Sequence, residues 1–233
     1  MKFTYKGSDG RKELRKFLAE SEKEESEPEV DEEKEEPETD YQSDENFIYV
    51  PSINLYVARQ RSLLGENWSD CTTELHSRNQ RMPTPKEFIE FLKYIKTHEE
   101  EIYKEITEIK TPWRAEWLDA SFELKGKELL LNYYIFDVNG KIELKSEKLD
   151  ANTLRENKNP GISLEDYLNN NHTSQGLPTK KVSGGKMYYW KPIKGRVAGF
   201  VANSGRTYLD CSGFPSSSLD NLWVRAVKLA SII

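Results

Sequence analysis

The chain has 233 residues, of which 36% are hydrophobic and 32% charged, and its formal net charge is −6. This length suits one sizeable core, or one domain with a tail. Residues 20–46 hold fifteen acidic residues and two lysines, a net of −13, so the remaining sequence is basic at +7. That charge is spread thinly, with no Lys/Arg stripe along a helix, which argues against a nucleic-acid partner.

Cysteine count and hydropathy argue against several further classes of protein. Cys71 and Cys211 are the only cysteines, too few for a disulfide framework or a four-cysteine zinc site. We expect two buried thiols, with a single bridge left open if the protein is exported. Residues 1–19 lack an apolar signal-peptide core, and no run approaches ~18 apolar residues. We therefore expect no membrane span and a cytoplasmic location by default, with surface display left open.

The first 46 residues are predicted to lie outside the folded domain. In residues 1–19, Leu14, Phe17 and Leu18 mark one apolar face of a short basic helix, marginal by itself. Residues 20–46 carry too few apolar side chains to offset the entropy of ordering, which predicts a disordered acidic linker. An acidic interaction segment is the functional alternative.

Order is predicted to begin at Phe47. Residues 47–58 are β-rich, with a break at Pro51, and a helix is expected around residues 68–76.

The best-defined helix follows Thr84. Thr84 suits the N-cap, Pro85 the first helical position and Glu87 the capping box. Its predicted buried face consists of Phe88, Phe91, Leu92 and Ile95. A second, highly charged and exposed helix is expected over residues 99–109.

Strands dominate the remaining prediction. Residues 117–124 and 128–136 form a predicted hairpin, and a further turn is expected at 138–141. Residues 145–179 are poor in hydrophobics, which predicts loop with one short helix opened by Ser163.

Three strands are predicted near the carboxyl end, at residues 186–192, 198–203 and 207–212. In the second, Ala198, Phe200 and Ala202 alternate with varied residues, the period of a strand with two different faces. After a loop over 213–221, residues 222–229 are expected to form one closing strand.

Catalytic and cofactor motifs are not evident. No two of His76, His98 and His172 have metal-ligand spacing, and no Gly-rich phosphate loop occurs. We expect no metal and no cofactor. The tryptophans are interpreted as core anchors.

The segment 196–222 has an unusual composition. None of its 27 residues is Lys, Glu, Gln, Trp or Met, although these types supply 64 of the 233 residues in the chain. Burial or a turn-rich structure also depletes Lys and Glu, which is the plain alternative. The Asn, Gly, Arg, Asp, Ser and Phe that it contains are typical of recognition loops. Phe214, between Gly213 and Pro215, is a candidate exposed aromatic anchor.

Two motifs carry a resemblance to a known family. Residues 80–88 (QRMPTPKEF) resemble the helix entry of C-type lectin folds of the formylglycine-generating-enzyme type. Residues 197–200 (VAGF), 208–209 (YL) and 222–227 (LWVRAV) resemble the ending of variable proteins of diversity-generating retroelements, especially archaeal ones. That family usually has glycine where Trp223 stands. The resemblance covers residues 47–228 and implies an α+β, C-type lectin-like ligand-binding domain over residues 47–233.

The resemblance also implies how the segment varies. Mutagenic copying at the adenines of AAC-like codons cannot produce Lys, Glu, Gln, Trp or Met. Within a variable region of about residues 197–222, it implies a fixed framework and a set of diversified ligand-binding positions. The framework would be Ala198, Phe200, Ala202, Tyr208, Leu209, Cys211 and Val224. The diversified positions would be Gly199, Val201, Asn203, Gly205, Arg206, Asp210, Ser212, Gly213, Phe214, Ser217, Ser218 and Leu219, with Phe214 and Arg206 the foremost contact residues.

Two hypotheses follow. The first is a non-enzymatic binding protein whose ligand is an unidentified protein or surface molecule held on a rigid scaffold. The second is an oxidoreductase of the formylglycine-generating type, which requires Cys71 and Cys211 to lie together as a reactive pair, although a shared fold does not imply a shared function.

Overall fold

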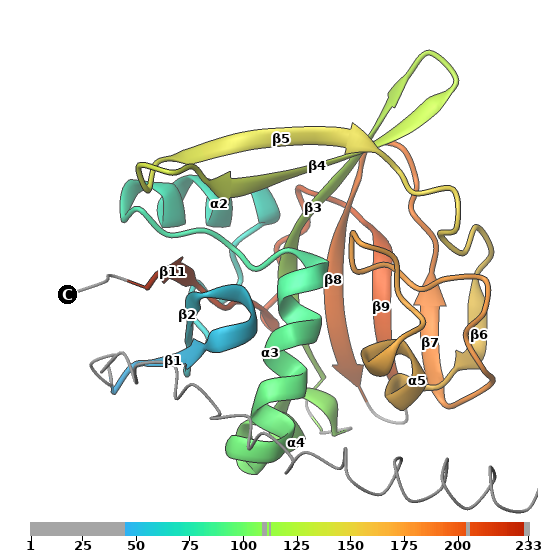
Figure 1. Ribbon diagram of the computed structural model, residues 1–233, viewed down its shortest axis with the longest axis horizontal. Helices are drawn as coiled ribbons and strands as arrows, with labels where there is room; N and C mark the ends of the chain where they lie inside the picture. The colour runs from blue at the N-terminus through green and yellow to red at the C-terminus, as the bar shows by residue number, and fades with distance from the viewer. Residues whose placement is uncertain (1–44, 109–110, 112, 204–205, 231–233) are drawn as a thin grey trace, which may run out of the picture. The chain divides into compact units, whose positions relative to one another are not determined.

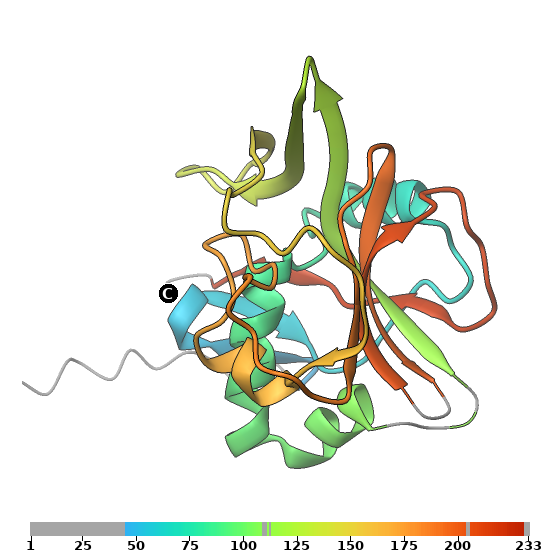
Figure 2. The same cartoon turned by 90° about the vertical axis from the view of Figure 1, so that its right-hand side faces the viewer.

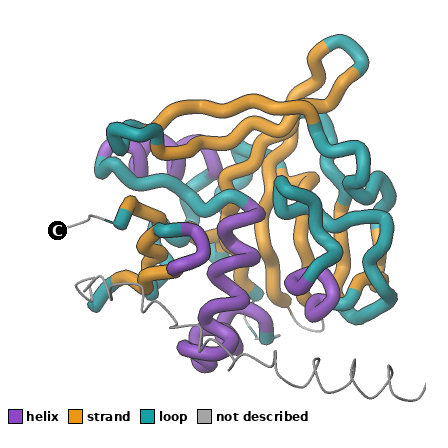
Figure 3. The backbone as a smooth tube through the Cα atoms, in the orientation of Figure 1, coloured by secondary structure: helices purple, strands orange, loops and turns teal. Residues whose placement is uncertain are grey.

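The computed structural model describes residues 45–108, 111, 113–203 and 206–230, which form a sheet-rich α+β fold (Figures 1 and 3). The sequence predictions for residues 1–44 and for Gly205 lie outside these residues. The elements are β1 (Phe47–Val50), the 3-10 helix η1 (Pro51–Ile53), β2 (Leu55–Ala58), α2 (Trp68–Ser77), α3 (Pro85–His98), α4 (Glu100–Thr107), β3 (Arg114–Lys125), β4 (Glu128–Phe136), β5 (Ile142–Lys148), β6 (Lys158–Ile162), α5 (Leu164–Asn169), β7 (Met187–Trp190), β8 (Arg196–Asn203), β9 (Arg206–Gly213), β10 (Leu222–Val224) and β11 (Val227–Leu229).

The strands form two sheets. A three-stranded sheet has the order β1-β2-β11, and an eight-stranded sheet runs β5-β4-β3-β8-β9-β7-β6, with β10 beside β3. The pairs β10–β3 and β7–β9 are parallel, and the other paired strands are antiparallel. Figure 2 shows α3 on one side of the large sheet, with α2 and the loop after β9 on the other. The sheet therefore has two covered faces.

Helix α3 begins as the sequence predicts. The Thr84 hydroxyl accepts a hydrogen bond from the Glu87 amide at 3.2 Å, and the Glu87 carboxylate accepts one from the Thr84 amide at 2.8 Å. The four residues of the predicted buried face are all buried. Glu87 also receives two hydrogen bonds from the buried Arg81 guanidinium, at 2.6 and 2.7 Å. The helix start is thus tied to the segment before it.

The prediction for residues 145–179 is wrong in part. The short helix is present as α5, and Ser163 caps it by accepting from the Asp166 amide at 3.2 Å. However, no strand was predicted where β5 and β6 lie, and β6 and the end of β5 fall in the predicted loop. Both are the outermost strands of the large sheet, and most of their residues are exposed or half-buried. An edge strand facing solvent needs few apolar residues, so the hydrophobic pattern does not mark it.

The predicted closing strand is in fact two strands in different sheets. β10 pairs with β3, whereas β11 pairs with β2, and the chain bends between them at Arg225. The Arg225 guanidinium donates two hydrogen bonds to the Glu116 carboxylate, both at 3.0 Å, and a third to the Ala58 carbonyl at 2.9 Å. The Arg225 and Glu116 side chains are 0% and 4% exposed. A buried charge thus sets the bend.

The buried hydrophobic residues form two clusters. The first, which we call the helix-side core, joins α3 to the large sheet and includes Phe88, Phe200 and Leu209. The second, the loop-side cluster, includes Trp117 and Val201. Because neighbouring residues of a strand point to opposite faces, β8 contributes to both clusters by alternation. In the described part of the chain, no helix is long and apolar enough to cross a membrane.

We predict that Arg225→Ala lowers the free energy of unfolding by about 3–5 kcal/mol, because it leaves the Glu116 carboxylate buried without a partner. Urea denaturation measures this change. Arg78→Ala is the matched control, since Arg78 forms an ion pair with Glu74 in which both side chains are about half exposed, and it should change stability by less than about 1 kcal/mol. Equal effects of the two substitutions would contradict the structural role of Arg225.

Candidate functional site

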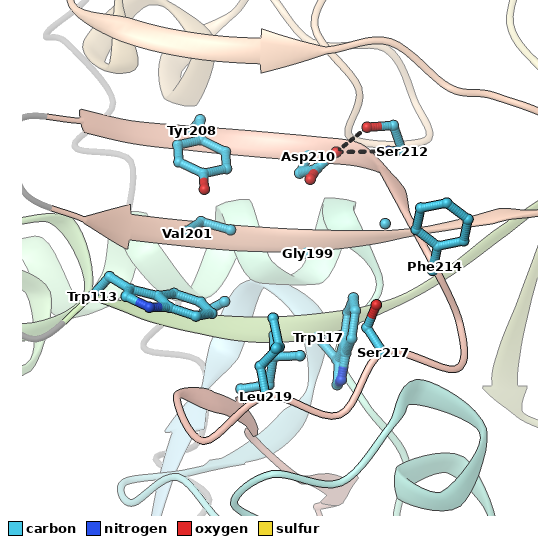
Figure 4. Close-up of a pocket in the computed structure, with 13 residues that line it drawn as sticks. Trp113, Trp117, Gly199, Val201, Tyr208, Asp210, Ser212, Phe214, Ser217 and Leu219 are labelled. Atoms are coloured by element: carbon cyan, nitrogen blue, oxygen red, sulfur yellow. Dashed lines mark hydrogen bonds between the residues drawn. The ribbon is translucent and has the colours of Figure 1, made fainter.

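A cavity of about 310 Å³ opens on the face of the large sheet opposite α3 (Figure 4). Strands β3, β8 and β9 and the loop after β9 supply its walls. We call it the sheet-face cavity; its lining consists of Trp113, Ala115, Trp117, Gly199, Val201, Tyr208, Asp210, Ser212, Gly213, Phe214, Ser217, Leu219 and Leu222.

The register of three neighbouring strands builds this cavity. Two rows of opposed residues cross β9, β8 and β3 in turn: Asp210–Gly199–Trp117 and Tyr208–Val201–Ala115. In each row the middle strand carries a smaller side chain than its β9 neighbour. Adjacent strands lie ~4.8 Å apart, so the outer strands are separated by roughly 10 Å. The rows therefore leave a depression over Gly199 on β8 and Ala115 on β3, with Tyr208 and Asp210 as one wall.

Two glycines leave room for the indole of Trp117. A Cβ atom on Gly199 would lie 3.4 Å from this ring and 3.3 Å from the Glu116 carbonyl oxygen, and one on Gly213 would lie 3.1 Å from the ring. The indole N–H donates to the Glu66 carbonyl oxygen at 3.2 Å. Close packing and one hydrogen bond therefore fix the ring at the edge of the cavity.

Asp210 is held by its neighbour Ser212. Its Oδ1 atom accepts hydrogen bonds from the Ser212 amide at 2.7 Å and the Ser212 hydroxyl at 2.6 Å (Figure 4). Burial raises the pKa of the adjacent Tyr208, and the nearby Asp210 charge raises it further, while Arg206 opposes the shift. The cavity wall thus presents an oriented carboxyl group beside a neutral phenol.

The loop after β9 is anchored at several points. The Pro215 carbonyl accepts from the Trp68 amide at 3.1 Å, and the Phe214 carbonyl accepts from the Ser217 amide at 3.0 Å. The Arg196 guanidinium stacks on the Phe214 ring, with its central carbon 3.2 Å from the ring centroid. Phe214 and Leu219 remain 57% and 49% exposed. These two apolar side chains therefore form an accessible rim on a fixed loop.

Eight of the twelve positions predicted to bind ligand line this cavity. They are Gly199, Val201, Asp210, Ser212, Gly213, Phe214, Ser217 and Leu219. Asn203 and Arg206 face each other at the far end of the β8–β9 pair, and Ser218 is exposed in the loop. Arg206, expected as a foremost contact residue, stacks over Tyr188 at 5.1 Å and is outside the lining.

The predicted framework residues are buried, with one exception. Ala198, Phe200, Ala202, Leu209, Cys211 and Val224 all lie in the interior. Tyr208 instead lines the cavity beside Asp210. The period of the strand predicts this outcome: Leu209 and Cys211 point into the helix-side core, so Tyr208 must share a face with Asp210.

Sequence reasoning missed the contribution of β3. Trp113, Ala115 and Trp117 line the cavity, although the tryptophans were interpreted only as core anchors. Their spacing of two residues places them on one face of an extended strand. That signal was available in the sequence, but nothing there shows that this strand lies beside β8.

The two cysteines lie in separate hydrophobic clusters. Cys71 belongs to the loop-side cluster and Cys211 to the helix-side core, and both are free and buried. Burial raises the pKa of Cys71 to about 12 and that of Cys211 well above its ordinary value. Since the thiolate is the reactive form, this arrangement gives no specific support to reactive-cysteine chemistry.

Neither metal-ligand clusters in the described residues nor comparisons with known proteins indicate another site. Across residues 45–230, as far as the structure describes them, no group of three or more His, Cys, Asp or Glu side chains is placed to hold a metal ion. Comparisons of the chain with protein-family models, curated proteins and solved structures gave no match. The site is therefore interpreted from its own geometry.

A second group of buried polar side chains lies near the start of α3. Asp119 accepts a hydrogen bond from the Tyr134 amide at 3.0 Å, while its Oδ1 atom has no hydrogen-bond partner among the described residues. Burial raises the pKa of Asp119 to about 8, against the opposing effect of Arg81. The folded protein therefore holds Asp119 in its neutral form at acidic pH.

We predict that the helix-side face of β8 tolerates substitution less well than the loop after β9. Phe200→Ala removes a ring packed against Phe88 and should cost about 3–5 kcal/mol of unfolding free energy. Ser217→Ala on the cavity rim should change it by less than about 0.5 kcal/mol. Urea denaturation of both variants measures the difference. Comparable losses would show that the rim is part of the stabilising core.

We predict that Asp119 makes the fold less stable as pH rises. Between the ordinary pKa of 3.8 and the folded pKa of about 8, the unfolded chain has lost this proton and the folded chain keeps it. Unfolding free energy should therefore fall through this window, by up to ~1.4 kcal/mol per pH unit from this group.

Asp119→Asn removes the titration and preserves an acceptor for the Tyr134 amide. Urea denaturation at several pH values should show a smaller fall in the variant than in the native chain. Parallel pH profiles would assign the dependence to other groups.

Proposed function

We propose that this chain is a ligand-binding protein that displays a diversified surface, the variable protein of a diversity-generating retroelement, on a C-type lectin-like scaffold. Its ligand would be a protein or surface molecule, and we place its action in the cytoplasm by default. The observation that carries the proposal is the division of β8 and β9. Eight of the twelve positions expected to vary line one cavity, and all but one of the expected framework positions are buried.

This division suits a protein whose binding residues change while its fold does not. A buried residue such as Phe200 contributes packing energy that substitution would remove. A rim residue such as Leu219 is about half exposed, at 49%, so its replacement costs little stability. Binding specificity is therefore free to change with the side chains around the cavity, because paired strands and an anchored loop hold their backbone in place.

The composition of the same segment agrees with this division. The segment 196–222, which lacks Lys, Glu, Gln, Trp and Met, supplies ten of the thirteen lining residues. Burial alone does not account for this, because several of these residues are half-buried or exposed. The three other lining residues come from β3 or the residue before it, and two of them are tryptophans, a type absent from the segment. The cavity thus combines a β3 wall that contains two tryptophans with a wall of restricted composition.

We predict that copies of this gene from closely related genomes differ mainly at the proposed variable positions. Substitutions should concentrate at the six non-glycine positions that line the cavity and be depleted at the buried neighbours Ala198, Phe200, Leu209 and Cys211. Gly199 and Gly213 should vary less, because a Cβ atom there would crowd the Trp117 ring. Sequencing these loci measures where the substitutions fall. A search beside them for a near-identical template repeat and a reverse transcriptase tests for the retroelement. Substitutions spread evenly along residues 196–222 would refute the proposal.

A further inference from the structure

We propose that the sheet-face cavity of this chain receives a cationic side chain, a lysine or an arginine, from a protein partner. This inference rests on the proposed binding function and names the chemistry of its ligand. It is carried by an unpaired carboxylate, by the aromatic residues around it, and by the size of the cavity.

Asp210 supplies the charge. It is the only Asp, Glu, Lys or Arg in the lining, and no ion pair joins it to a basic side chain within the described residues. Ser212 occupies its Oδ1 atom with two donors. No donor from the described part of the chain reaches Oδ2. A carboxylate beside apolar walls gains from a cation that approaches this free oxygen.

Arg196 of β8 and Arg206 of β9 each stack on an aromatic ring. Arg196 stacks on Phe214 with its central carbon 3.2 Å from the ring centroid, and Arg206 stacks over Tyr188 at 5.1 Å. Neither belongs to the cavity lining. Among the described residues no basic side chain forms an ion pair with Asp210, so a cation supplied by a ligand would balance its charge.

Aromatic residues surround the same space. Trp113 and Trp117 lie on the β3 side, Tyr208 on the β9 side and Phe214 at the rim (Figure 4). The faces of aromatic rings carry partial negative charge, and they attract ammonium and guanidinium groups, most strongly where water is excluded. The Tyr208 oxygen also offers an acceptor close to Asp210. Carboxylate and rings thus favour the same sign of ligand charge.

The size of the cavity selects a single side chain. Its volume of about 310 Å³ lies at the lower end of the ~300–1,000 Å³ usual for ligand pockets. Val201 and Leu219 give apolar surface for a methylene stem, as lysine and arginine require when their charged ends are bound. An exposed rim around one partly enclosed anchor point is typical of protein recognition. We therefore favour a protein partner over a free small cation.

The test uses n-butylammonium and n-butylguanidinium as probes, with n-butanol as the neutral probe of similar length. Binding to the full chain is followed by the NMR shifts of the tryptophan indole N–H groups. Both cations should shift Trp113 or Trp117 and bind about tenfold more tightly than n-butanol. Asp210→Asn keeps an Oδ1 acceptor for Ser212, and it should remove this preference while leaving the affinity for n-butanol unchanged.

Two further variants control for disruption of the fold. Trp113→Leu should weaken cation binding and spare n-butanol, because it removes a ring but keeps an apolar surface. Ser218→Ala, exposed and outside the lining, should change neither. Equal affinity for cation and alcohol, cation binding that survives Asp210→Asn, or no indole shift with any probe would overturn the proposal. Since gene comparison tests the variable-protein proposal separately, either inference can fail without the other.

Discussion

The ion pair between Arg225 and Glu116 is the constraint on which the architecture depends. It lies where the chain leaves the large sheet after β10 and enters the small sheet as β11. Arg225 binds the carboxylate through two nitrogens, donates to the Ala58 carbonyl at the end of β2, and lies over the Phe91 ring of α3 at 5.5 Å. One guanidinium therefore joins both sheets and the main helix. Burying two charges is costly, but such a pair tolerates little change in geometry.

The same pair acts on the candidate site through β3. Glu116 points toward α3, so its neighbours Ala115 and Trp117 point to the opposite face, where they line the cavity. Fixing Glu116 thus fixes the β3 wall of the site. Trp117 is held further by its hydrogen bond to the Glu66 carbonyl and by the room that Gly199 and Gly213 leave for its indole. Side chains on β9 and the following loop then set the other walls.

Strand alternation separates the helix-side core from the cavity in this fold. On β9, Leu209 and Cys211 pack in the helix-side core, while Asp210 and Ser212 form a hydrogen-bonded pair facing the cavity. A change on one face leaves the packing of the other in place, because the two sets of side chains are separated by the sheet backbone. The cavity can therefore carry, among aromatic rings, a carboxylate that has no ion-pair partner in the described residues. This arrangement favours the binding of a ligand more than the stability of the isolated fold.

The sequence by itself determined the local structure and part of the site. The capping box of Thr84 and Glu87, the β3–β4 hairpin and the alternation at Ala198 and Phe200 depend on near neighbours, whose spacing is visible in the chain. Only the tertiary structure decided what depends on distant pairing. The edge strands β5 and β6 lack an apolar signature, and the bend at Arg225 depends on a carboxylate 109 residues away. The place of Trp117 across Gly199 from Asp210 likewise follows from the register of β8 with β3 and β9, which hydrogen bonds between remote segments set.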